Sequence, residues 1–147
     1  MSAHPVILLV DDDRDLLAGL SLALARSDRS VISCQDIESA KLLIEALPIT
    51  HIVSDVRLTG PFEYEGLGLV QYLRERSPET VAILMTGAFT PELATEAQNR
   101  GSVAVLQKPF SIDDLEAVLD RFERNAPHDG LPELMEIPLL DEIIASD

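Results

Sequence analysis

The sequence predicts an α/β protein built on a doubly wound parallel sheet with helices on both faces. Five short apolar runs are rich in Val, Ile and Leu, and segments of helical period separate them. Strict alternation with short connections favours right-handed crossovers between parallel strands. We therefore expect five strands in the flavodoxin-like order 2-1-3-4-5, with a functional crevice at their carboxyl ends, around the switch point between the first and third strands.

The apolar runs are the predicted strands. Their near-continuous apolarity, without alternation of polar and apolar residues, is typical of strands in a parallel sheet that is covered on both faces. In chain order the predicted strands are residues 6–10, 30–34, 51–54, 80–85 and 103–106.

The segments between the strands are predicted helices, because the first three carry one apolar stripe each. The stripes are Leu16, Leu17, Leu20 and Leu24, then Ala40, Leu43, Ile44 and Leu47, then Leu69, Val70 and Leu73.

Capping signals agree with these helices. Asp36 is placed to cap the second helix, and Thr90 before Pro91 opens the fourth. Ser111 and Asp114 have the spacing of a capping box for the fifth helix. Gly101 stands where a helix end favours a left-handed residue.

The length and apolar content fit one compact domain with its own core. The chain has 147 residues, of which 46% are hydrophobic, so no metal or disulfide staple is needed. The helical pattern breaks after Arg124, in a segment that contains Pro127 and Gly130. We expect a domain over residues 1–125, and residues 126–147 as a linker or tail. Within this tail the residues 139–144 could form a short amphipathic helix.

The charge argues against direct nucleic-acid binding as a function. The formal net charge is -15, from 26 acidic and 11 basic residues, and the basic residues are scattered singly. No apolar run approaches the roughly 20 residues of a membrane span, and residues 1–5 do not resemble a signal peptide. The single cysteine, Cys34, has the neighbours of a buried strand. A cytoplasmic protein without a membrane partner is the expectation.

Polar side chains stand at the ends of four predicted strands. Since the carboxyl ends of parallel strands meet at one edge of the sheet, these side chains should lie close together. They are Asp11, Asp12 and Asp13 after the first strand, Asp55 after the third, Thr86 after the fourth and Lys108 after the fifth.

Carboxylates crowded in this way need a positive partner, because like charges at short range repel. Mg²⁺ uses carboxylates, water and phosphate oxygens as ligands, and Lys108 would add a fixed charge. The set suits phosphoryl transfer, with Asp55 as nucleophile and Thr86 and Lys108 each holding one phosphoryl oxygen.

Each of these residues also has an ordinary structural explanation. A lone Asp after a strand is usually a turn or cap residue, and we expect Asp13 to be one, opening the first helix. Thr86 before Gly87 fits turn chemistry, and Lys108 before Pro109 fits a surface turn. The coincidence of four strand ends in the right order favours a functional site.

Four stretches together resemble the signatures of response-regulator receiver domains, over roughly residues 5–124. The stretches are Val10-Asp11-Asp12-Asp13, Ile52-Val53-Ser54-Asp55, Leu84-Met85-Thr86-Gly87-Ala88 and Gln107-Lys108-Pro109-Phe110.

The resemblance implies that a sensor histidine kinase or phosphotransfer protein phosphorylates Asp55. It implies that Asp12, Asp55 and the backbone carbonyl of Arg57 bind Mg²⁺ directly, while Asp11 acts largely through water. Lys108 would bond the phosphoryl group, and its peptide bond to Pro109 would be cis. An output domain or effector protein is the implied target, and the resemblance admits a homodimer.

Three departures from the family pattern concern the relay rather than the pocket. Thr59 replaces the usual proline four residues after the acceptor. The loop from Arg57 to Gly66 is about three residues longer than usual and carries Phe62 and Tyr64. Val105 stands where an aromatic switch residue is common.

Two other functions compete with a phosphoacceptor. A metal-dependent phosphatase with an aspartyl-phosphate intermediate would carry a second acid two residues after Asp55, where Arg57 stands. A pseudo-receiver would keep the fold as an interaction module without phosphorylation, but the complete set of polar residues argues against it. Finally, residues 137–147 are similar to the lead-in helix of EAL-type cyclic-di-GMP phosphodiesterase domains, although an ordinary amphipathic tail has the same pattern.

Overall fold

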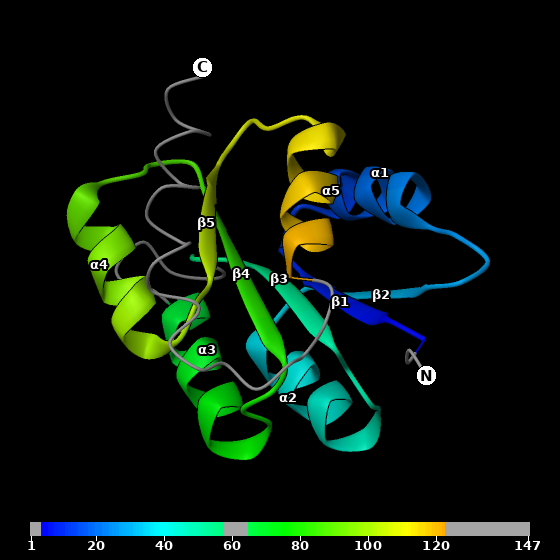
Figure 1. The fold of residues 1–147 in the computed structure, drawn as a ribbon, viewed down its shortest axis with the longest axis horizontal. Coiled ribbons are helices and arrows are strands. Elements are labelled where there is room, and N and C mark those ends of the chain that lie inside the picture. Colours follow the sequence, from blue (N-terminus) through cyan, green and yellow to red (C-terminus); the bar gives the residue numbers. More distant parts are fainter. Residues whose placement is uncertain (1–3, 58–64, 123–147) are drawn as a thin grey trace.

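The computed structural model describes residues 4–57 and 65–122, and it confirms the predicted flavodoxin-like α/β fold (Figure 1). In the described residues strands and helices alternate without exception. The strands are β1 (Val6–Val10), β2 (Ser30–Cys34), β3 (His51–Asp55), β4 (Val81–Thr86) and β5 (Ala104–Gln107). The helices are α1 (Arg14–Leu24), α2 (Ile37–Ala46), α3 (Glu65–Arg76), α4 (Pro91–Arg100) and α5 (Ile112–Arg121).

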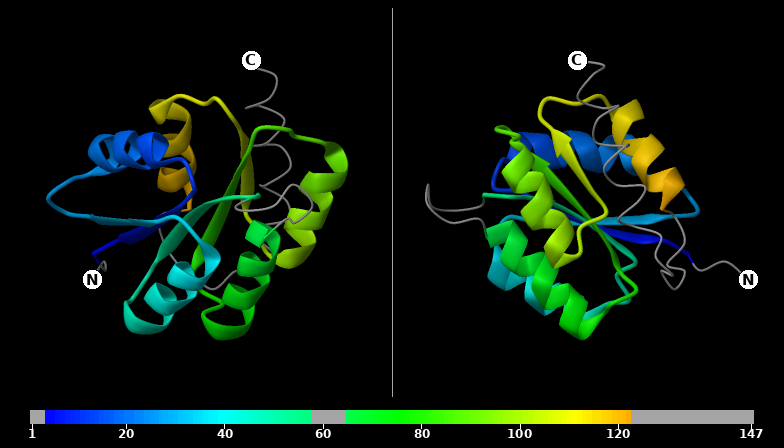
Figure 2. Two further views of the ribbon diagram at one scale, coloured as in Figure 1. Left: turned by 180° about the vertical axis from the view of Figure 1, so that it is seen from behind. Right: turned by 60° about the vertical axis from the view of Figure 1, so that its left-hand side comes forward.

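The five strands form one parallel sheet in the order β2-β1-β3-β4-β5. Helices α1 and α5 cover one face, and α2, α3 and α4 cover the other (Figure 2). The chain order reverses beside β1, so that β1 and β3 are neighbours, with Val10 paired to Ser54. This pairing brings the residues after β1 next to the end of β3, as the sequence predicts.

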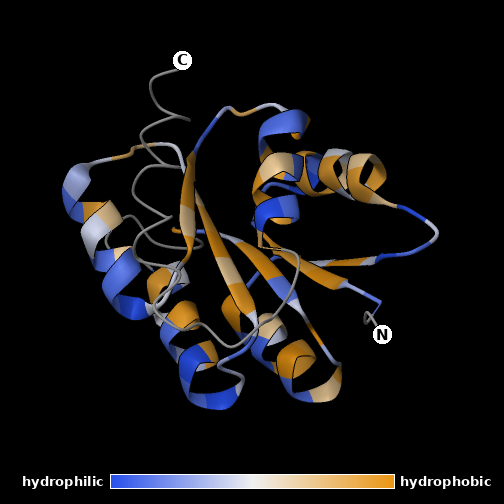
Figure 3. Cartoon of the chain, in the orientation of Figure 1, coloured by the Kyte–Doolittle hydropathy of each residue, from blue (hydrophilic) through white to orange (hydrophobic). Residues whose placement is uncertain are grey.

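Each face of the sheet has its own apolar core, as Figure 3 shows by the orange inner sides of the helices. Leu17, Leu20 and Leu24 of α1 are buried with Leu115 and Val118 of α5 against one face. The predicted stripe of α3, residues 69, 70 and 73, is buried in the cluster on the other face. Burial of both faces is why the strand sequences are apolar throughout.

The predicted caps are all formed. Asp13 accepts a hydrogen bond from the Leu16 amide, and Asp36 and Thr90 cap α2 and α4 in the same way. Ser111 and Asp114 form the capping box of α5, and Gly101 ends α4 with a φ of 115°. A left-handed residue there lets the Gly101 amide reach the last carbonyls of the helix.

Five strand boundaries, on three strands, differ from the prediction by one residue. Strand β3 extends to Asp55, β4 runs from Val81 to Thr86, and β5 from Ala104 to Gln107. The backbone ladder continues past the apolar run, because pairing depends on backbone groups and not on side-chain polarity. As a result, polar side chains stand on the last residues of three adjacent strands.

Cys34 corrects a second expectation, because it is half-buried rather than buried. Strand β2 is one of the two edge strands of the sheet, and none of its residues falls in the buried class. An edge position alone does not determine this exposure, because β5, the other edge strand, has three of its four residues buried.

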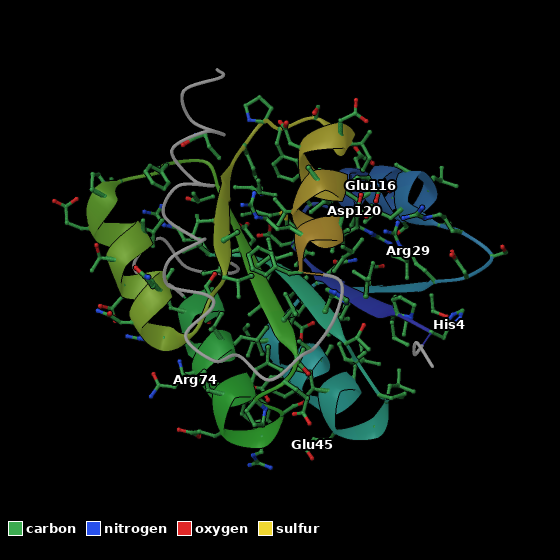
Figure 4. The ribbon with its side chains drawn as sticks, in the orientation of Figure 1. His4, Arg29, Glu45, Arg74, Glu116 and Asp120 are labelled. Atoms are coloured by element: carbon green, nitrogen blue, oxygen red, sulfur yellow. The ribbon has the colours of Figure 1, made fainter. Side chains whose placement is uncertain are left out.

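A partly buried ion pair connects α5 to the turn before β2. Arg29 is 8% exposed and donates to both Glu116 carboxylate oxygens, at 3.1 and 3.0 Å, and to the Leu24 carbonyl at 3.0 Å. Figure 4 shows Arg29 and Glu116 side by side between these elements. The fork of the guanidinium suits this double contact, so the pair fixes the position of α5 on the sheet.

Several predictions concern residues outside those the structure describes. They are the long loop with Thr59, Phe62 and Tyr64, the domain end near residue 125, and the tail helix within residues 139–144. Among the described residues, none of the helices has the length and apolarity that crossing a membrane requires.

Candidate functional site

Three aspartates meet at the carboxyl edge of the sheet. Asp11 and Asp12 follow β1, and Asp55 is the last residue of β3. One carboxylate oxygen of each lies within 4.8 Å of the others. Asp11 is fully buried, Asp55 is half-buried and Asp12 is exposed. The predicted convergence of these carboxylates is therefore present in the fold.

Local hydrogen bonds set the direction of the Asp11 side chain. Its Oδ1 accepts from the Asp13 amide at 2.9 Å, while its own amide donates to the Cys34 carbonyl at 3.2 Å. Asp13 turns away to cap α1, the structural role expected of it. Of the three consecutive aspartates, Asp11 and Asp12 therefore belong to the carboxylate cluster, and Asp13 caps α1.

Lys108 supplies the positive charge of the cluster. Its Nζ lies 2.8 Å from Oδ2 of Asp11 and 3.5 Å from Oδ2 of Asp55. Its amide donates to the Thr86 carbonyl at 2.7 Å, and its peptide bond to Pro109 is cis, as the family resemblance implies. Lys108 is thereby held between the ends of β4 and β5 and directed at β1 and β3.

Burial and charge act in opposite directions on the ionisable groups. Burial raises the pKa of Asp55, with a further rise from Asp11, and Lys108 opposes both. For Lys108, burial lowers the pKa, but the hydrogen bond to Asp11 and the charges of Asp55 and Asp11 together raise it. A positive Lys108 is thus favoured by the two carboxylates it faces.

A cavity of about 250 Å³ opens beside Asp55. It is lined by Asp55, Arg57, Thr86, Gly87, Ala88 and Lys108. The Thr86 hydroxyl accepts from the Ala88 amide at 3.0 Å, and its own hydrogen remains for donation to another acceptor. The cavity therefore offers one carboxylate, one ammonium and one hydroxyl to a small anionic group.

The donor set fits a hard divalent cation. All three acidic residues offer oxygen, which Mg²⁺ and Ca²⁺ prefer, and the exposed Asp12 leaves the cluster open to solvent. Mg²⁺ keeps several waters and takes one or two carboxylates, so three carboxylates in reach are sufficient. Arg57, whose backbone carbonyl the family resemblance implies as a further ligand, lines the adjoining cavity.

Two residues that sequence reasoning did not single out also shape the site. A Cβ on Gly66, in the first turn of α3, would lie 2.3 Å from the Asp55 carbonyl oxygen, so only glycine fits. The Gln107 side chain bonds the loop after Thr86. A glycine in a helix start is a weak signal for the first, and no sequence pattern indicates the second.

Comparison with known proteins places this geometry in a family. The sequence profile of the response regulator receiver domain matches residues 7–120. The DNA-binding transcriptional regulator NtrC of Klebsiella pneumoniae is 32% identical over 116 residues, which are 77% of this chain and 24% of NtrC. The chain thus corresponds to about a quarter of that relative's length.

Solved structures agree with the profile. The beryllofluoride-activated NtrC4 receiver domain dimer is 27% identical, with a TM-score of 0.74, over 82% of this chain and 98% of that one. A response regulator from Burkholderia pseudomallei, with a phosphorylated aspartic acid, calcium ion and citrate, is 25% identical, with a TM-score of 0.70. The match covers 78% of this chain and 66% of that one. The match over residues 7–120, together with the shared fold, shows that this chain belongs to the response regulator receiver domain family of two-component systems.

Proposed function

We propose that Asp55 accepts a phosphoryl group in a Mg²⁺-dependent reaction and that the resulting change of shape regulates an output domain or partner. The observation that supports this most is the cavity beside Asp55, with Lys108 bridging Asp55 and Asp11 at 3.5 and 2.8 Å. A nucleophile, a fixed cation and a hydroxyl face one small volume, which is the arrangement that phosphoryl transfer requires.

In this proposal a carboxylate oxygen of Asp55 attacks the phosphorus of the donor. The bond from phosphorus to the donor's histidine nitrogen breaks, the nitrogen keeps the electron pair, and an acyl phosphate forms on Asp55. Lys108 and the Thr86 hydroxyl each hold one phosphoryl oxygen. Asp11, Asp12, Asp55 and the carbonyl of Arg57 would hold Mg²⁺, which supplies neutralisation of the negative charge on the phosphoryl oxygens.

The proposed partners follow from the same family. We infer a sensor histidine kinase or phosphotransfer protein as phosphoryl donor, and an output domain or effector as the target, in the cytoplasm. The dimeric NtrC4 receiver supports a homodimer as a candidate state. We place the receiver at residues 1–125 and a linker or tail at 126–147.

Intact-mass measurement after incubation with acetyl phosphate tests the proposal. With Mg²⁺, the protein should gain the mass of one phosphoryl group, and Asp55→Asn should not, because an amide is no nucleophile. Asp28→Asn is the matched control, since Asp28 is an exposed aspartate in the turn before β2. Stoichiometric labelling of folded Asp55→Asn would overturn the assignment of the acceptor.

The same measurement separates the alternatives. A metal-dependent phosphatase would consume acetyl phosphate over many turnovers without stable labelling. A pseudo-receiver would neither gain mass nor consume the donor. Loss of labelling when Mg²⁺ is chelated supports the metal site, and undiminished labelling without any divalent cation would contradict it.

A further inference from the structure

The carboxamide of Gln107 joins the two segments that carry Thr86 and Lys108. Its Oε1 accepts from the Phe89 amide at 3.1 Å, and its Nε2 donates to the Gly87 carbonyl at 3.2 Å and to the Lys108 carbonyl at 3.0 Å. Gln107 is the last residue of β5 and pairs with Thr86, the last residue of β4. The side chain therefore bridges the loop 87–89 and the Lys108 turn just beyond the sheet.

The pattern uses both donors of the amide nitrogen and one acceptor position of the amide oxygen. The oxygen meets a donor and the nitrogen meets two acceptors, so rotating the amide by half a turn would set like groups against each other. A carboxylate could not donate to the two carbonyls. Among side chains of this length, glutamine is the one that matches all three partners.

The loop held in this way forms part of the cavity. Gly87 and Ala88 line it together with Thr86 and Lys108. At its far end the loop enters the apolar cluster through Phe89, and α4 begins at Pro91. Gln107 thus fixes the loop at Gly87 and Phe89, on both sides of Ala88.

Val105, a buried residue nearby on β5, has an apolar side chain that cannot form hydrogen bonds like those of Gln107. It is fully buried in the cluster on the α3 and α4 face, and its β-branched side chain has few rotamers. Any link between the loop and β5 therefore has to come from another residue, and the three bonds of Gln107 provide one.

We propose that Gln107 is a positioning residue of the phosphoryl site, which keeps the loop 87–89 and Lys108 at a fixed spacing across the cavity. This inference rests on the proposed function. A preorganised site loses less conformational freedom on binding, so the bridge should strengthen the binding of a phosphoryl group without contacting it.

The test is the variant Gln107→Met, which keeps the length of the side chain and loses all three hydrogen bonds. The dissociation constant of beryllofluoride, measured at saturating Mg²⁺, should rise by about tenfold, which is the loss expected for roughly one net hydrogen bond. The dissociation constant of Mg²⁺ alone should stay within about twofold, because the proposed metal ligands lie outside this bridge. The Phe89 amide should exchange its hydrogen faster by a similar factor in the absence of ligand.

Two controls distinguish the bridge from general damage. Gln71→Met makes the same change on the exposed side of α3 and should leave all three measurements unchanged. Gln107→Ala should repeat the effect of Gln107→Met, which guards against a packing effect of the methionine itself.

The outcomes are separable. Wild-type affinity for beryllofluoride in folded Gln107→Met overturns the proposal, and so does an equal loss of Mg²⁺ affinity, which would mean that the whole pocket is disturbed. If the wild-type protein itself fails to bind beryllofluoride, the proposed function fails. In that case the hydrogen-exchange rate of the Phe89 amide still tests whether Gln107 holds the loop. An unchanged rate in Gln107→Met would refute this role.

Discussion

At the scale of single residues, the site is a balance between carboxylates that repel and one lysine that holds them together. Asp11 is fully buried, and Lys108 contacts it at 2.8 Å. A buried charge that loses its partner is costly, because water does not replace the interaction. Lys108 therefore contributes to stability as well as to the proposed chemistry.

The first prediction is that Lys108→Met lowers the free energy of unfolding in metal-free buffer by about 2 kcal/mol. This is below the roughly 3–5 kcal/mol of a fully buried pair, because the Lys108 side chain keeps 25% of its surface exposed. Urea unfolding measures it, and Mg²⁺ should restore part of the loss. Asp12→Ala provides the contrast: removing a like charge should hold or raise metal-free stability while Mg²⁺ affinity falls. Equal stability of Lys108→Met and the wild type would contradict the balance.

The second prediction concerns Cys34, whose pKa burial raises from 9.0 to about 11. This rise reduces the thiolate fraction at pH 7 by about a hundredfold, and the thiolate is the species that alkylates. Iodoacetamide should label the folded protein about a hundredfold more slowly than the protein in urea. The rate in the folded protein should keep increasing as the pH rises from 9 towards 11. A plateau near pH 9 in the folded protein would show an ordinary, accessible thiol.

The polar residues at the strand ends could be predicted from the sequence, but the hydrogen bonds that a side chain makes to other segments could not. Asp11, Asp12 and Asp55 follow apolar runs, and the order of the strands alone brings them together. The bridge made by Gln107 depends on the spacing of β4 and β5 and on the turn after Thr86, which no local pattern carries. The apolar run around Cys34 predicts a buried strand, and only the structure shows that no residue of β2 falls in the buried class.

At the scale of elements, the approach of α3 to the end of β3 determines how Asp55 is placed. The Gly66 amide donates to the Val56 carbonyl at 2.9 Å, and the space for a Cβ is occupied by the Asp55 backbone. Such contact with backbone cannot be relieved by a side-chain rotation. The start of α3 and the candidate acceptor therefore form one rigid unit.

The third prediction is that Gly66→Ala destabilises the protein by about 1–3 kcal/mol, the usual cost of overpacking against a fixed neighbour. It should also slow phosphorylation by acetyl phosphate, since the Asp55 backbone has to shift. Gly68→Ala is the matched control two residues along the same helix, where a Cβ meets nothing within 4 Å. That change should be neutral or stabilise by up to about 1 kcal/mol, because alanine favours a helix interior. Similar unfolding curves for both variants would contradict the close approach.

Element order could be predicted well, and element ends less well. Alternating apolar runs and amphipathic segments specify strands and helices, and Asp13, Asp36, Thr90 and Ser111 mark where four helices begin. Apolarity is the sequence signal for a strand, so it predicts the ends of β3, β4 and β5 one residue too early. The polar residue Asp55 still pairs with Met85, because pairing is a backbone interaction.

At the scale of the whole molecule, two apolar clusters pack on opposite faces of one sheet, and the site lies at the edge between them. We therefore expect a conformational response to the proposed phosphorylation along the connections at that edge rather than through the cores, which are densely packed and resist deformation. Two such connections line the cavity, through Arg57 and through Gly87 and Ala88.

The last prediction is that beryllofluoride changes hydrogen exchange in residues 57–66 more than in residues 103–106. Val105 is fully buried, and the strand around it is paired with β4, so a response there would require a packed core to rearrange. The segment 57–66 begins at a residue that lines the cavity and ends at Gly66 against the Asp55 backbone, so both of its ends contact the site.

Exchange measured by mass spectrometry, with Mg²⁺ present and with and without beryllofluoride, checks this prediction. Asp55→Asn under the same conditions is the control, because it should show no difference between the two samples. Most of the segment 57–66 lies outside the described residues, so its response is inferred from its two ends. If protection changes instead concentrate in α4 and β5 while residues 57–66 stay constant, Val105 is no obstacle to a relay through β5 and the loop is not the responding element.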